Sequence, residues 1–222
     1  MKLLNESGGG KLYESNGFIV PVLTGMSTEM GTQYGVLMAE RMQETWDVLV
    51  EPGLKAGQIT DKVMRRCTDR AYTTCSTRMR QFYDGVAKGS GWPLDKVGML
   101  DQLMELGIYQ SKIHSFAGCT SILSWGSHSA DGNRYAGRNL DWGPGFNKFP
   151  QILTVLRPTD GSYKYATTGW PGMYSAFTAL NEHGVFLDVH DGTSISGSVV
   201  YEERPSILNV LWTSMGATAS WV

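Results

Sequence analysis

The sequence predicts an α+β fold, with helices in the first half and short strands in the second. Helical patterns occupy most of residues 27–112, whereas the region from residue 119 onward alternates β-branched and aromatic runs with Gly, Asn and Asp turns. Strands in succession, with helices before and after them, favour a layered α+β arrangement over alternating βαβ units. At 222 residues the chain can bury a core as one large domain or two small ones.

The first half is predicted to contain strands at its start and then three helices. Weak alternation over residues 11–24 indicates the strands. Apolar residues recur every three or four positions over 27–50, 60–88 and 94–112, which is the spacing of amphipathic helices. We therefore expect the first 118 residues to be mostly helical.

The first predicted helix carries two local features. We expect Ser27 or Thr28 to cap its N-terminus, with Glu29 in the first turn. Gly31 and Gly35 lower helix propensity. We interpret this pair as a face that packs closely against a neighbouring element.

The second half is predicted to contain short strands and a final helix. The turns at Asp131-Gly132 and Asp160-Gly161 are typical of β-hairpins. Pro205 precedes a helical pattern over 206–216. The predicted strands are 119–126, 133–140, 151–157, 163–169, 174–180 and 184–190.

Composition argues against several classes of protein. With 19 Lys and Arg against 21 Asp and Glu, the net charge is −2, and no basic tract indicates nucleic acid or an anionic membrane as partner. No stretch reaches the roughly 18 apolar residues of a membrane span. The first residues lack the apolar core of a signal peptide, which fits a cytoplasmic protein or an exported one whose signal is not part of this sequence.

The cysteines and histidines do not predict a disulfide or a metal site. Cys67 and Cys75 fall in one predicted helix, about 12 Å apart along its axis, which is beyond the reach of a disulfide. Cys and His residues are not spaced as in zinc sites. We expect no cofactor, and we interpret His183 and His190 as structural or surface residues.

Cys119 differs from the other two cysteines because it follows Gly118 at the start of a predicted strand. The turn at residues 131–132 returns the chain and brings Arg138 and Asp141 toward it. A cation stabilises a thiolate, and a carboxylate orients a base. Arg138 and Asp141 occupy opposite faces of an ideal strand, so they converge only if the chain bends between them.

The blocks around these residues resemble a known enzyme family. GCTS at 118–121, ADG at 130–132, GRNLDW at 137–142 and ALNEHGV at 179–185 resemble the N-terminal-nucleophile (Ntn) hydrolases of the linear-amide type. This group includes choloylglycine hydrolases, acid ceramidase-like enzymes and penicillin acyltransferases. An upstream block, residues 23–35, looks like the pro-segment of the acyltransferase branch.

The resemblance implies the four-layer αββα sandwich of Ntn hydrolases. Members of the family continue well past the position of Val222, so we expect this chain to hold only the N-terminal portion of that sandwich. Residues 1–118 would form a mostly helical pro-segment that stays bound as a small subunit. Residues 119–222 would be the start of the catalytic sheet core, truncated, and a homo-oligomer is left open.

The resemblance also implies a self-processing cysteine amidohydrolase or acyltransferase. Cleavage between Gly118 and Cys119, through an N-to-S acyl shift, would free an α-amine that serves as the base. Cys119 would then form an acyl-thioester with a small-molecule linear amide. In the family pattern Arg138 favours the thiolate, Asp141 holds the amine and Asn181 donates to the developing oxyanion, with no metal or cofactor.

Three loop-associated apolar residues are candidates for substrate binding: Trp142, Trp170 and Met173. Such residues line a pocket or simply close a core. Asn181 has an alternative role as well, because Asn181-Glu182-His183-Gly184 is favourable hairpin chemistry. The acyl group, the amine, and the choice between hydrolysis and transfer are not specified by these residues.

Two other functions remain open at this point. The first is a papain-like cysteine protease with a histidine base, for which the candidates are His114, His128, His183 and His190. The second is a catalytically silent homologue that keeps the fold and binds a ligand in its cleft. Neither depends on a new N-terminus at Cys119.

Overall fold

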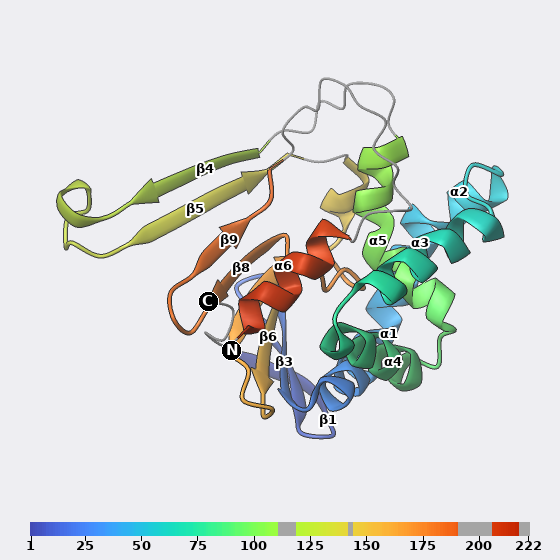
Figure 1. The fold of residues 1–222 in the computed structure, drawn as a ribbon, viewed down its shortest axis with the longest axis horizontal. Coiled ribbons are helices and arrows are strands. Elements are labelled where there is room, and N and C mark those ends of the chain that lie inside the picture. Colours follow the sequence, from blue (N-terminus) through green and yellow to red (C-terminus); the bar gives the residue numbers. More distant parts are fainter. Residues whose placement is uncertain (111–118, 142–143, 191–205, 218–222) are drawn as a thin grey trace.

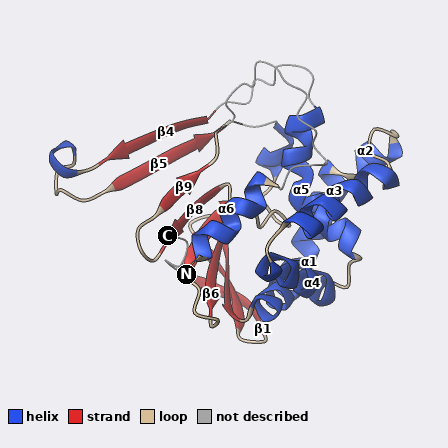
Figure 2. Cartoon of the chain, in the orientation of Figure 1, coloured by secondary structure: helices blue, strands red, loops and turns tan. Residues whose placement is uncertain are grey.

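The computed structural model describes residues 1–110, 119–141, 144–190 and 206–217, and shows a mixed α+β fold (Figure 1). These residues form a large mixed sheet, a separate two-stranded sheet and six α-helices. The helices gather on one side of the large sheet, and the two-stranded sheet projects on the other side (Figure 2).

The large sheet joins strands from both ends of the chain. Its order is β1-β2-β3-β6-β7-β8-β9, with β3 and β6 parallel and the other neighbours antiparallel. Residues on both sides of position 118 therefore share one sheet. The strands are β1 (Lys2–Ser7), β2 (Gly10–Ser15), β3 (Phe18–Gly25), β6 (Ile152–Pro158), β7 (Tyr165–Gly169), β8 (Thr178–Asn181) and β9 (Phe186–Asp188); the small sheet is the hairpin of β4 (Cys119–Ser124) and β5 (Tyr135–Leu140).

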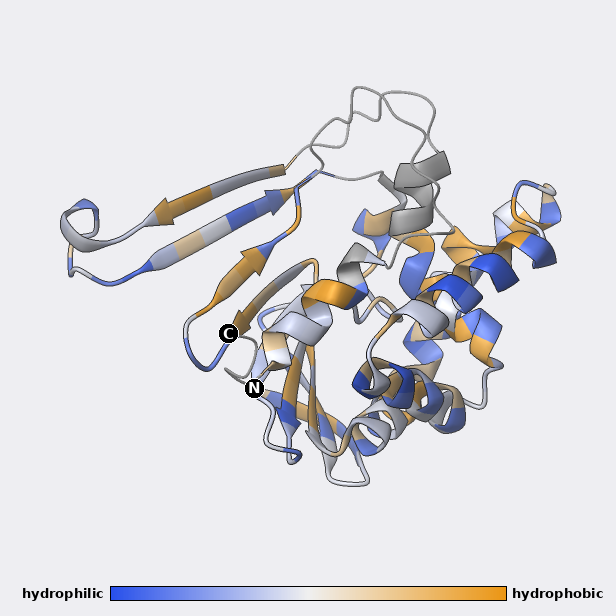
Figure 3. Cartoon of the chain, in the orientation of Figure 1, coloured by the Kyte–Doolittle hydropathy of each residue, from blue (hydrophilic) through white to orange (hydrophobic). Residues whose placement is uncertain are grey.

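Side chains of the large sheet alternate between a buried face and a more open one. On β6, for example, Ile152 and Leu156 are buried in the core while Leu153 is half-buried on the opposite side. Strands β8 and β9 are rich in apolar residues (Figure 3), and Leu180 of β8 is exposed on the open face. Thr178 of β8 and Asp188 of β9 are paired and therefore share the open face.

The helices agree with the predicted positions except in the second pattern and in the short helix α2, which was not predicted. They are α1 (Ser27–Leu49), α2 (Glu51–Lys55), α3 (Asp61–Thr74), α4 (Thr77–Ser90), α5 (Leu94–Gln110) and α6 (Ile207–Gly216), with 3₁₀ turns at Gly126–His128 and Pro144–Lys148. The prediction of one helix over 60–88 is wrong. Cys75 is extended, and the Ser76 hydroxyl accepts the N–H of Met79 as an N-cap, so a new helix begins there.

The predicted cap of α1 is also wrong. Met26 occupies the N-cap position, and its N–H donates to the Glu29 carboxylate at 2.7 Å. The Ser27 hydroxyl is buried, without a hydrogen-bond partner in the described part of the chain. The Glu29 side chain, in the first turn as predicted, thus accepts a backbone N–H at the start of the helix. This capping role was expected of Ser27 or Thr28.

The prediction of a close-packing glycine face is confirmed. Gly31 and Gly35 of α1 lie against α4, where a Cβ at Gly31 would overlap the carbonyl oxygen of Phe82. In return, a Cβ at Gly85 would overlap the carbonyl oxygen of Thr28. The two helices can approach this closely only because neither carries a side chain at the contact.

Residues 23–35 act as a structural junction. The Gln33 amide donates to the carbonyls of Gly8 and Thr24, both at 2.8 Å, and accepts the Thr24 N–H at 2.9 Å. The neighbouring Tyr34 hydroxyl accepts the N–H of Gly172 at 3.0 Å. Helix α1 is therefore tied to the start of the sheet and to the loop that precedes β8.

A buried carboxylate organises that same loop. Asp101 of α5 is fully buried and accepts hydrogen bonds from the Tyr83 and Ser175 hydroxyls, both at 2.6 Å, and from the N–H groups of Tyr174 and Ser175, both at 3.0 Å. Burial raises the pKa of Asp101, and these hydrogen bonds oppose the rise. Residues 174–177 were predicted as part of a strand but form a loop, in which the N–H groups of Tyr174 and Ser175 bind this carboxylate instead of a neighbouring strand.

No helix among the described residues is both long enough and apolar enough to cross a membrane.

We expect Asp101→Asn to lower the free energy of unfolding by about 1–3 kcal/mol. The asparagine amide is itself a donor, and it would face the Tyr83 and Ser175 hydroxyls, which also donate at this position. Asp101→Ala should cost more, about 3–5 kcal/mol, since it leaves the whole group of donors without an acceptor. Urea denaturation measures both. Asp69→Asn, on an exposed position of α3, is the matched control, and an Asp101→Asn protein as stable as that control would contradict this role.

Candidate active site

The hairpin β4–β5 brings Cys119 and Arg138 together. Cys119 pairs with Leu140, and Ser121 pairs with Arg138. Paired residues and those two positions apart share a face of a sheet, so these side chains all face the large sheet. The Arg138 guanidinium donates to the Cys119 sulfur at 3.3 Å.

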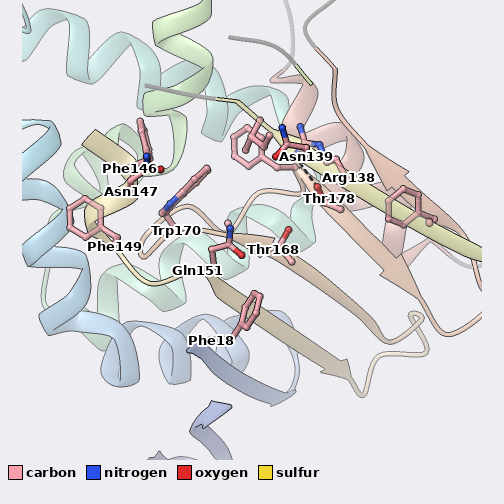
Figure 4. Close-up of a pocket in the computed structure, with 15 residues that line it drawn as sticks. Phe18, Arg138, Asn139, Phe146, Asn147, Phe149, Gln151, Thr168, Trp170 and Thr178 are labelled. Carbon is pink, nitrogen blue, oxygen red and sulfur yellow. Dashed lines mark hydrogen bonds between the residues drawn. The ribbon is translucent and has the colours of Figure 1, made fainter. Parts of the chain in front are cut away.

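Arg138 also fastens the hairpin to the large sheet. Its Nη1 donates to the Thr178 hydroxyl at 2.9 Å (Figure 4). Its Nη2 donates to the Val189 carbonyl at 2.5 Å. The nitrogen that binds Val189 is the one that contacts Cys119. A single guanidinium thus reaches β4, β8 and the residue after β9, which fixes the cation beside the sulfur.

Cys119 is the most accessible of the three free thiols. Its side chain is partly exposed, whereas Cys67 is 1% exposed and Cys75 is 8% exposed. Burial raises the pKa of Cys75 to about 11, and the nearby Arg80 opposes this rise. At neutral pH a nucleophile is therefore expected at Cys119 and not at Cys75.

A polar cluster next to this contact was not found from the sequence. Ser121 donates to the Asp188 carboxylate, and the His190 Nε2 lies 2.8 Å from the Ser121 hydroxyl and 2.6 Å from Asp188. The local signal for it was the alternation within the predicted strand 184–190, which places Asp188 and His190 on one face. His190, interpreted from the sequence as structural or surface, lies in this cluster.

Asp141 is not brought to the sulfur. Its carboxylate is exposed and accepts a hydrogen bond from Asn139 at 2.6 Å. Asn139 lies on the face of β5 opposite to Arg138. The chain between Arg138 and Leu140 keeps its regular strand pairing, so the bend that would make Arg138 and Asp141 converge is not seen in the described residues.

Asn181 lies on the other face of β8 from Thr178. It is 7% exposed, and its carbonyl oxygen accepts the N–H groups of His183 at 3.1 Å and Val185 at 3.0 Å. Its amide donates to the Met215 carbonyl of α6 at 3.4 Å. These contacts fit the alternative role expected from the sequence, in which Asn181 stabilises a hairpin turn.

Of the remaining site residues, Gly118 and Trp142 lie outside the described residues. Trp170 is buried and packs on Phe146, with the two ring centroids 4.8 Å apart. Met173 is buried in the core. Trp170 thus reaches a pocket wall, and Met173 closes the core behind it.

The pocket beside Trp170 has a volume of about 480 Å³ and lies between the hairpin and the large sheet (Figure 4). Arg138 and Thr178 form part of its wall, and amide side chains alternate with aromatic rings around the rest. Its lining residues are Phe18, Ala136, Arg138, Asn139, Leu140, Phe146, Asn147, Phe149, Gln151, Thr168, Gly169, Trp170, Phe177, Thr178 and Phe186.

A second and larger pocket, of about 1050 Å³, continues beneath the hairpin on the other side of Thr178. It is more apolar and shares Ala136, Thr168, Thr178 and Phe186 with the first pocket. Its other lining residues are Leu123, Ser124, Trp125, Arg134, Tyr135, Leu153, Ala166, Ala179, Leu180 and Gly184. The shared residues include the one that holds Arg138, so the two pockets meet next to the guanidinium.

Within the described ranges, no group of three or more His, Cys, Asp and Glu side chains is placed to hold a metal ion. No protein-family model matches the chain, and no curated protein matches it significantly. The family resemblance therefore rests on the sequence blocks themselves.

We expect Arg138→Met to slow alkylation of Cys119 by iodoacetamide about tenfold at pH 7.5, because the fixed positive charge beside the sulfur is lost. Arg138→Lys should retain part of the rate, since a lysine keeps the charge but not the planar fork that binds Val189 and Thr178. Peptide mapping by mass spectrometry gives the rate for each cysteine separately.

Cys67 and Cys75 serve as internal controls in the same samples. Both should stay unmodified at pH 7.5, because both side chains are buried and burial raises the pKa of Cys75 to about 11. Equal Cys119 rates in wild type and Arg138→Met would contradict an influence of Arg138 on the thiol.

Proposed function

We propose that this protein is a self-processing cysteine amidohydrolase or acyltransferase of the Ntn type, acting on linear, non-peptide amides through an acyl-thioester on Cys119. The observation that carries the proposal is the contact of 3.3 Å between the Arg138 guanidinium and the sulfur of Cys119, at the first position of β4. A partly exposed thiol beside a fixed cation is the environment of a reactive cysteine.

The order of layers supports the corresponding fold. Helices gather on one side of the seven-stranded sheet, and a two-stranded sheet projects from the other side. We propose that these are the first layers of an αββα sandwich, in which β4–β5 belongs to the second sheet. Cys119 then lies between the two sheets, with its side chain facing the first.

The chemistry splits amide cleavage into two easier steps. The thiol gives its proton to the α-amine of Cys119 once the bond to Gly118 has been cut, and the sulfur attacks the substrate carbonyl. The C–N bond breaks, the leaving amine takes the proton, and an acyl-thioester remains. Water completes hydrolysis, or an acceptor amine completes transfer.

Arg138 stabilises the thiolate in this proposal. Asp141 and Asn181 have other partners in the described structure, and Asn181 lies on the face of β8 away from Cys119. The proposal therefore rests on Cys119 and Arg138 and assigns neither of those two residues a contact with the sulfur. The segment before Cys119 would stay bound after cleavage, because β3 and β6 pair within the large sheet and α1 packs on it.

The pockets indicate a small, largely apolar substrate. Both lie within the space between hairpin and sheet, and both reach Thr178, the residue that holds Arg138. Aromatic and aliphatic side chains dominate the larger one. An amide with an apolar group on at least one side of its C–N bond fits this arrangement.

A second candidate is a cysteine hydrolase with His190 as the base. His190 lies beside Ser121, two residues along the strand from Cys119, but its Nε2 contacts Ser121 and Asp188, so the thiol proton would have to go to Nδ1. His190→Gln separates the candidates: the Ntn mechanism keeps its activity because its base is the α-amine, whereas the histidine mechanism loses it.

The test is a screen of N-acyl amides by mass spectrometry, with Cys119→Ser as the matched variant. We expect turnover of at least one amide by the wild type, and a loss of more than a hundredfold in Cys119→Ser, because serine lacks the thiol's nucleophilicity near neutral pH. Turnover that survives in Cys119→Ser would overturn the proposal. Tight binding of an amide without turnover would indicate a silent binding protein instead.

A further inference from the structure

Three consecutive residues at the end of β9 hold the hairpin against the large sheet. The Asp188 carboxylate accepts the hydroxyl of Ser121. The Val189 carbonyl accepts Arg138 at 2.5 Å, and His190 lies 2.8 Å from Ser121. Each of the three therefore contacts a side chain from the same face of the hairpin, the face that carries Cys119.

The protons in this cluster can be assigned from its geometry. Burial tends to raise the pKa of Asp188, but hydrogen bonds from Ser121 and His190 outweigh it and lower the pKa below the usual range. An ionised carboxylate only accepts, so the contact of 2.6 Å with His190 Nε2 is a hydrogen bond when Nε2 carries the hydrogen, which is the tautomer assigned here. The Ser121 hydroxyl donates to the same carboxylate oxygen.

This assignment excludes a serine nucleophile in the arrangement seen. In a Ser–His–Asp triad one imidazole nitrogen faces the serine and the other faces the aspartate. Here the single atom Nε2 contacts both Ser121 and Asp188. Since it carries a proton, it has no lone pair with which to accept the hydroxyl proton of Ser121.

The cluster is coupled to the sulfur through Arg138. Ser121 lies two residues from Cys119 on the same strand face and pairs directly with Arg138. The guanidinium nitrogen that contacts Cys119 is bound to the Val189 carbonyl, between Asp188 and His190. Any shift of β4 along β9 would therefore change the separation of the guanidinium and the sulfur.

We propose that Ser121, Asp188 and His190 are positioning residues that clasp β4 to the end of β9 and so hold Arg138 against the sulfur of Cys119. A role for this clasp in catalysis rests on the proposed function. The contacts themselves concern the thiol and its cation, whatever the substrate is. The titratable or charged groups that face Asp188 are His190 and Arg138.

A double-mutant cycle on the alkylation rate of Cys119 tests the clasp without an amide substrate. Ser121→Ala should slow the reaction with iodoacetamide about threefold to tenfold at pH 7.5. Adding Ser121→Ala to Arg138→Met should give no further loss, because the clasp acts through Arg138. Intact-mass measurement ensures that all variants are compared in the same state of processing.

Conservative variants distinguish positioning from a general loss of stability. Ser121→Thr keeps the hydroxyl and should keep the alkylation rate. His190→Gln keeps a donor toward Asp188 and should also keep the rate. His190→Ala removes that donor and should slow the reaction as Ser121→Ala does. Thr120→Ala, on the exposed face of β4, should change nothing. An unchanged rate in Ser121→Ala, or losses that multiply in the double variant, would overturn the clasp.

The outcome is independent of the amide screen. If Ser121→Ala leaves the alkylation rate of Cys119 unchanged while an amide is turned over, the clasp is overturned and the proposed function stands. A cycle that succeeds while no amide is turned over would leave the clasp as a feature of a reactive thiol, and would count against the enzyme.

Discussion

The candidate site depends on one cation. The Arg138 guanidinium binds the sulfur of Cys119, the hydroxyl of Thr178 and the carbonyl of Val189, so it joins the small sheet to the large one. A two-stranded hairpin is marginally stable by itself, and Ile122 of β4 is 71% exposed to solvent. Its position on the large sheet is therefore set mainly by polar contacts, and the strongest of these carry a charge.

The partners of Arg138 are in turn positioned by the buried core. Thr178 begins β8, directly after a loop whose N–H groups are held by Asp101 and by the hydroxyl of Tyr34. Tyr34 lies on α1, which approaches α4 through facing glycines. The motif at residues 23–35 thus contributes to the site at a distance, by fixing the strand that receives the guanidinium.

Local sequence patterns predicted the features that depend on residues close together in the chain. The helical period gave α1 and α5, the pair Asp131-Gly132 predicted the β4–β5 hairpin, and the spacing of Gly31 and Gly35 predicted a packing face. The break at Ser76 was missed because a hydroxyl cap can interrupt an otherwise continuous helical period. The contacts of Ser121 with Asp188 and His190 join residues far apart in the chain, and no local signal encodes which side chains meet across two sheets.

The central claim is that Cys119 becomes a nucleophile when the bond before it is cut. Intact-mass measurement of the purified wild type and Cys119→Ala tests this most directly. The account predicts that the wild type converts to two fragments, the second beginning at Cys119, while Cys119→Ala stays whole. A wild-type chain that persists at full length, with a mass pattern identical to that of Cys119→Ala, would contradict it.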